Sequence, residues 1–112
     1  MLGLIIILRN QKKTVSSMSK IFELIFPEEL SGVEIEGVDV QMLALDAVRL
    51  VDYFFKQSTL TEEQHHVLKE IHGDLPKVVR ALSGGHKKYF QHIQQAVSDV
   101  MNVLKEQHGL FA

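Results

Sequence analysis

The sequence predicts an all-α fold, a small helical bundle of about four main helices with a minor two-stranded ribbon near the N-terminus. Three observations lead to this prediction. The chain has 112 residues, the size of one compact domain. Long stretches carry apolar residues at helical spacing, and only 2 Pro and 7 Gly interrupt the chain. Cysteine is absent, which excludes a disulfide framework and a thiolate zinc site.

Composition and charge narrow the class of function. Lys and Arg total 12 and Asp and Glu total 14, which gives a net charge of −2 with neutral histidines. A chain without excess positive charge is disfavoured for binding nucleic acid. A hydrophobic content of 46% argues against disorder. No run approaches the roughly 20 apolar residues of a membrane span, so we expect a cytoplasmic protein.

Residues 1–17 form an apolar and basic N-terminal segment, which we separate from a single helical domain over residues 18–112. The run Met1–Leu8 is rich in Ile, and basic residues follow it. Because the basic residues come after the apolar run rather than before it, the segment does not resemble a secretory signal. We expect either a strand that packs on the domain or a poorly integrated extension.

A short helix and a strand are predicted next. Residues 19–26 are dense in Ile, Leu and Phe and are followed by Pro27, which predicts a helix that stops there. Residues 33–36 alternate apolar and acidic side chains, which is the period of a strand. A lone short strand is not stable, so it needs a partner. The Ile-rich N-terminus is the expected partner in the two-stranded ribbon.

Residues 40–57 are predicted to form the central helix of the bundle. Asp39 precedes them as a good N-cap, because its carboxylate can accept a hydrogen bond from a free backbone N–H of the first turn. Polar side chains in this stretch are confined to one narrow stripe. A helix that is apolar around most of its circumference is expected to be contacted from several sides.

Three further helices are predicted. Thr61 and Gln64 have the spacing of a capping box, which starts a helix that Gly73 is expected to end. A second amphipathic stretch covers residues 74–82. The last helix is expected from about His86 to His108.

Six histidines are the most unusual feature of the composition. Glu62, His66 and Glu70 recur at intervals of four, so they share one face of a helix. Glu63 and His66 also form the Glu-x-x-His step that carboxylate-bridged di-iron bundles use. The other predicted helices lack a second such step. We therefore expect an exposed acidic and imidazole face without metal or cofactor, and the alternative is a metal site that uses His66 and Glu70.

A second pattern consists of Arg80, His86 and the aromatic pair Tyr89-Phe90. It resembles the motif of the HEPN family of helical ribonucleases and nucleotidyltransferase partners. The resemblance implies that Arg80 holds a phosphate and that His86 is an acid or base for attack by a 2′-hydroxyl. The chain departs from the motif at Ala81, where the family prefers Asn, Asp or His, and at Gly84-Gly85, which interrupt the helix. This enzyme is the alternative hypothesis, and the leading one assigns no catalytic residue.

The leading hypothesis is a small non-enzymatic interaction or regulatory protein, such as an adaptor, an inhibitor or an immunity-type factor. It depends on a surplus of apolar residues beyond what one small core hides. A protein partner or a second copy is expected to cover that surplus, and a homodimer is favoured. Four aromatic residues and two lysines are expected to bind the partner: Phe54, Phe55, Tyr89, Phe90, Lys87 and Lys88.

Overall fold

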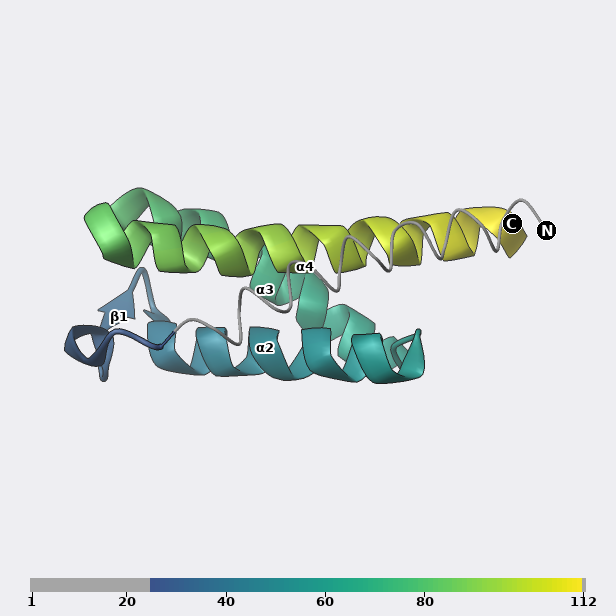
Figure 1. Cartoon of the computed structure of the whole chain (residues 1–112), viewed down its shortest axis with the longest axis horizontal. Helices are drawn as coiled ribbons and strands as arrows, with labels where there is room; N and C mark the ends of the chain where they lie inside the picture. The colour runs from purple at the N-terminus through teal and green to yellow at the C-terminus, as the bar shows by residue number, and fades with distance from the viewer. Residues whose placement is uncertain (1–24, 112) are drawn as a thin grey trace.

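Three long helices make up most of the computed structural model, which describes residues 25–111 (Figure 1). They are α2 (Val40–Gln57), α3 (Glu62–Ala81) and α4 (Gly84–Phe111). A 3-10 turn and two short strands precede them: η1 (Glu28–Leu30), β1 (Glu34–Ile35) and β2 (Val38–Asp39). The prediction of a helical fold with a small ribbon is therefore confirmed. The described residues contain three main helices, so the predicted number of about four is too high.

The ribbon pairs differently from the prediction. β1 and β2 are antiparallel neighbours, and Ile35 lies opposite Val38. Glu36 and Gly37 form the turn between them with positive φ angles of 50° and 81°. Two residues with positive φ match the right-handed twist of a hairpin, so the strand finds its partner locally. The expected partner in residues 1–17 and most of the short helix expected at residues 19–26 lie outside the described residues.

The start of α2 agrees with the sequence prediction. The Asp39 carboxylate accepts hydrogen bonds from the backbone N–H groups of Gln41 and Met42, at 3.0 and 3.1 Å. These bonds satisfy two donors that have no partner inside the helix. The cap therefore fixes where the helix begins, directly after the ribbon.

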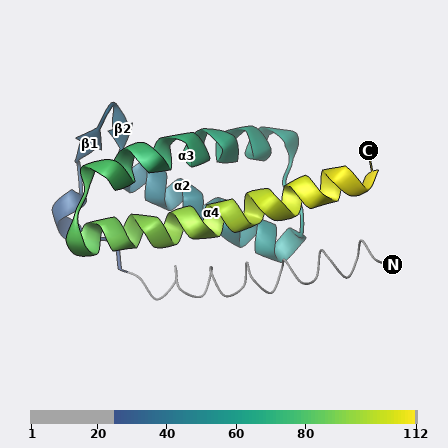
Figure 2. The same cartoon turned by 90° about the horizontal axis from the view of Figure 1, so that it is seen from above.

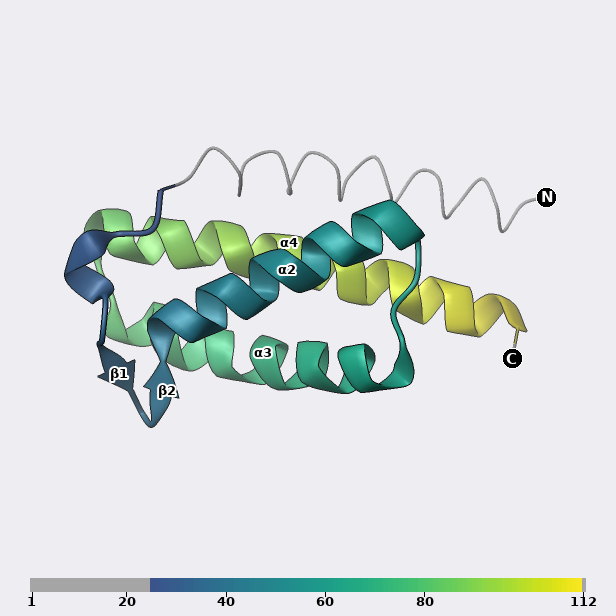
Figure 3. The same cartoon turned by 90° about the horizontal axis from the view of Figure 1, so that it is seen from below.

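α2 is not the central helix of the bundle, contrary to the prediction. Its buried residues lie on a single face: Val40, Leu43, Ala44, Ala47, Val51 and Phe54. α4 contributes the largest share of the core: Tyr89, Phe90, Ile93, Ala96, Val97, Val100, Val103 and Leu104. Figure 3 shows α2 lying across α3 and α4. Each of three helices in such an arrangement presents one face to the other two, so α2 keeps an outer face in contact with water.

α3 is continuous where the sequence predicted two helices. It begins at the predicted capping box, in which the Gln64 N–H donates to Thr61 Oγ1 at 3.1 Å and the Thr61 N–H donates to Gln64 Oε1 at 2.9 Å. It then passes through Gly73 and Pro76 to Ala81. Glycine inside a helix costs only about 1 kcal/mol relative to alanine. Burial of the same apolar face on both sides of Gly73 outweighs that cost, so the helix does not stop there.

We expect Gly73→Ala to stabilise the protein by about 0.5–1 kcal/mol and to raise Tm by several degrees. Gly73 is exposed, its φ is not positive, and an added Cβ would meet no atom within 4 Å. The control is Gly84→Ala, because Gly84 has a φ of +59°, where alanine is strained and should destabilise the fold. Thermal unfolding of both variants checks the prediction. A lower Tm for Gly73→Ala would contradict a continuous α3.

α3 and α4 lie side by side and run in opposite directions (Figure 2). α4 starts at Gly84 and reaches Phe111, beyond the predicted end near His108. Among residues 25–111, no helix is both long enough and apolar enough to span a membrane.

Candidate functional site

Large apolar side chains that remain exposed gather on α2. Four of the five such residues in the described part of the chain belong to this helix: Met42, Leu45, Tyr53 and Phe55. Their exposed fractions lie between 38 and 48%. An 18-residue helix that buries one face and leaves this much apolar surface in water is the clearest candidate for an interaction surface.

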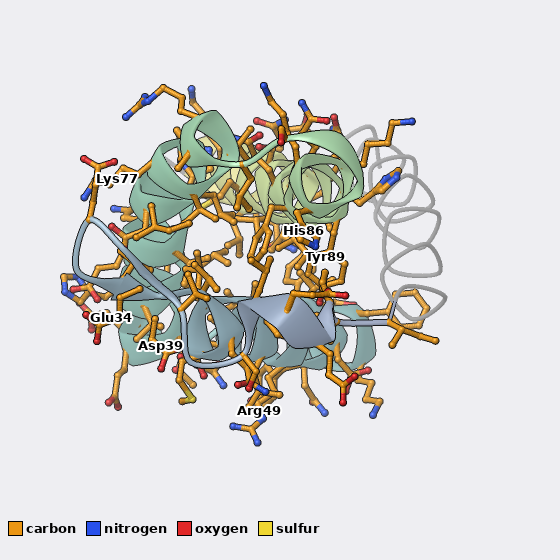
Figure 4. The ribbon with its side chains drawn as sticks, turned by 90° about the vertical axis from the view of Figure 1, so that its left-hand side faces the viewer. Glu34, Asp39, Arg49, Lys77, His86 and Tyr89 are labelled. Atoms are coloured by element: carbon orange, nitrogen blue, oxygen red, sulfur yellow. The ribbon has the colours of Figure 1, made fainter. Side chains whose placement is uncertain are left out.

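Three of these residues, Met42, Leu45 and Tyr53, lie in one line along α2 together with Arg49. We name these four residues the outer stripe. Leu45 and Tyr53 lie four residues before and after Arg49, so all three point to the same side of the helix. Figure 4 shows Arg49 projecting away from the bundle. Phe55 lies outside this stripe, about 120° around the helix from Arg49. The stripe is therefore an apolar line with a guanidinium group at its centre.

Acidic side chains flank the outer stripe. Asp46 and Asp52 lie three residues on either side of Arg49, one turn away in each direction. Asp52 Oδ2 lies 3.0 Å from Lys56 Nζ. Within the described residues, no ion pair or side-chain hydrogen bond engages Arg49. Its charge is thus available to a carboxylate from another molecule.

Three of the aromatic residues predicted to bind a partner lie in the core instead. Phe54 and Phe90 are almost fully buried, and Tyr89 is buried as well. Tyr89 stacks edge-on against Phe26 and Phe90, with ring centroids 5.7 and 5.1 Å apart. Burial raises the pKa of the Tyr89 phenol, because the charged phenolate is disfavoured away from water. In this conformation these three rings stabilise the bundle and are inaccessible to a partner.

The remaining predicted contacts reach the surface. Phe55 on α2 and Lys88 on α4 are exposed, and Lys87 is half-buried. The two lysines belong to the first turns of α4, whereas Phe55 lies near the end of α2. The sequence could not decide which of the adjacent residues Phe54 and Phe55 is buried, because that choice depends on where α4 packs.

The alternative catalytic pair is not joined by any contact in the described residues. His86 Nε2 lies 3.5 Å from Glu29 Oε2 of η1, and Figure 4 shows His86 beside Tyr89. Arg80 is exposed in the last turn of α3 and has no ion pair or side-chain hydrogen bond within residues 25–107. The contact that His86 makes is thus a link between η1 and the start of α4.

The alternative metal ligands His66 and Glu70 are both exposed and lie in contact one helical turn apart. His66 Nε2 lies 3.2 Å from Glu70 Oε1. No group of three or more His, Cys, Asp or Glu side chains in the described part of the chain is arranged to hold a metal ion. A metal at this position would find two protein ligands, both from α3.

A groove between α3 and α4 is a feature that the sequence analysis missed. It consists of two adjoining cavities of about 600 and 900 Å³, and His65 and Lys69 line both. Six side chains around the smaller cavity carry its polar chemistry: His65, Lys69 and His72 from α3, and Ser98, Asn102 and Lys105 from α4. Each set of three has the spacing i, i+4, i+7, which is visible in the sequence. The sequence does not show that the two sets face each other, because that depends on how α3 and α4 pack.

Comparisons with protein-family models, with curated proteins and with solved structures gave no match. The described residues offer two surfaces of different chemistry, namely the apolar outer stripe on α2 and the cationic groove between α3 and α4.

Proposed function

We propose that the protein is a small non-enzymatic interaction or regulatory protein that binds its partner through the outer stripe of α2. One observation carries this proposal: a single helix leaves four large apolar side chains exposed, and three of them lie on this stripe. Apolar surface in water is unfavourable, and patches of this kind commonly mark sites of protein association. An adaptor, an inhibitor and an immunity-type factor would each need such a surface.

A second copy of the chain is the occupant that we infer. A two-fold interface must be self-complementary, and the outer stripe has this property. When two α2 helices pack antiparallel around Arg49, Leu45 of one copy meets Tyr53 of the other, because both are four residues from the centre. Arg49 of one copy can then approach Asp46 or Asp52 of the other. The same register brings the two Arg49 side chains together at the two-fold axis, so the flanking aspartates of both copies are needed to neutralise them, and apolar contact is the main attraction.

The solution mass tests this proposal. Light scattering at micromolar concentration should give about twice the chain mass of 12.7 kDa, and dilution should lower the value toward the monomer. A mass that stays at 12.7 kDa when the sample is concentrated would contradict the dimer. The non-enzymatic part has a separate test. Cleavage of single-stranded RNA that Arg80→Ala and His86→Ala both abolish would contradict it and support the enzyme.

A further inference from the structure

We propose that the smaller cavity of the groove between α3 and α4 binds a small phosphate-bearing ligand. This site is separate from the outer stripe of α2 and does not depend on the function proposed for it. Four of its lining side chains carry or can take a positive charge, namely those of His65, Lys69, His72 and Lys105. None of the described residues that line this cavity is a carboxylate. A concave surface with this balance of charge favours an anion.

Two lysines and one histidine of the cavity have no partner within the described part of the protein. No ion pair or side-chain hydrogen bond within residues 25–107 engages Lys69, His72 or Lys105. Glu62 lines only the larger, adjoining cavity. His66 lines that cavity too, and it is paired with Glu70. An anion in the smaller cavity would therefore meet Lys69 and Lys105 without first displacing a protein carboxylate from them.

Rigid helices hold the polar groups on both sides of the cavity. His65, Lys69 and His72 extend about 10 Å along one face of α3. Because α3 and α4 run antiparallel (Figure 2), the end of α4 that carries Lys105 lies beside the His65 end of this line. Core residues alternate with these positions on both helices, such as Leu68 and Ile71 on α3 and Val100 and Val103 on α4, so the two polar lines keep their spacing. A site on packed helices is better preorganised than one on loops.

The number of positive side chains suits phosphate better than a single carboxylate. Lysine binds phosphate as a compact point charge, and a phosphate group carries about 1.5 to 2 negative charges, so it can interact with several of the lining groups at once. The Ser98 hydroxyl and the Asn102 amide can donate further hydrogen bonds to phosphate oxygens. A volume of about 600 Å³ is typical of small-molecule sites. The net charge of −2 for the whole chain disfavours an extended nucleic acid.

Pyrophosphate is the probe that tests this proposal. It is titrated into the full chain by calorimetry at about pH 6, where imidazole side chains generally gain positive charge. We expect saturable binding that Lys69→Gln weakens about tenfold, the loss expected for one charge-assisted hydrogen bond. The matched control is Lys77→Gln, which removes the same charge from the same helix outside the cavity, where Lys77 pairs with Asp74 at 3.2 Å. It should bind pyrophosphate like the parent.

Four results would overturn the proposal. The first is an absence of pyrophosphate binding by the parent chain. The second is equal weakening by Lys69→Gln and Lys77→Gln, which would mean that the chain attracts anions only through its total charge. The third is binding of citrate, at the same ionic strength, as tightly as pyrophosphate, which would refute the assignment to phosphate. The fourth is binding of a single-stranded RNA by a chain that does not bind pyrophosphate, which would show that the ligand is a polymer and not a small molecule.

Discussion

Val97→Asp should abolish stable folding. Val97 lies in the middle of α4 and is fully buried. An aspartate there would be a charge without a partner in the apolar core, or a protonated acid that lacks its hydrogen bonds. A cost of about 4 kcal/mol or more is expected, which is a large fraction of the roughly 5–15 kcal/mol by which a small domain is stable. Far-ultraviolet circular dichroism during urea titration measures the loss.

Val48→Asp is the informative comparison for this variant. If α2 were surrounded on several sides, as the sequence suggested, this substitution would be as damaging as Val97→Asp. Val48 is instead only half-buried at the edge of the core, where an aspartate can reach water. We therefore expect a cost of about 1–2 kcal/mol, which leaves the domain folded. An equal loss of stability from the two substitutions would show that α2 is the central helix after all.

Local signals in the sequence identified the starts of α2 and α3 correctly. The N-cap at Asp39 and the capping box at Thr61 and Gln64 depend on residues within one turn, and all are formed. The prediction that Gly73 ends a helix is wrong, because the position of a helix end depends on the burial of the residues on either side as well as on the residue itself. Glu36-Gly37 likewise gave a tight hairpin that an alternating pattern alone does not reveal.

The candidate sites were harder to predict than the fold, because each depends on which helix faces which. Phe54 and Phe55 are adjacent and equally apolar, yet only Phe54 points into the bundle. The cationic groove joins residues from two helices about thirty positions apart, such as His72 and Ser98 at one end. Sequence spacing groups side chains on one helix and is silent about the helix opposite.

Leu45→Asp should convert the proposed dimer into a monomer. In the antiparallel arrangement, each Leu45 packs on Tyr53 of the second copy, so the substitution would bury two uncompensated carboxylates at one interface. Because a two-fold interface repeats every change, a cost of about 2 kcal/mol at each site would weaken association roughly a thousandfold. Light scattering should then give a mass of about 12.7 kDa across the concentration range in which the parent is dimeric.

Ile25→Asp is the matched control for Leu45→Asp. Ile25 is also a large apolar residue and is 89% exposed, but it lies outside α2. The same change of chemistry at this position should leave the dimer intact. Arg49→Glu provides an independent arm, since it replaces attraction to Asp46 and Asp52 of the second copy with repulsion, and added salt should partly restore association. A dimer that survives both Leu45→Asp and Arg49→Glu would place the interface away from the outer stripe.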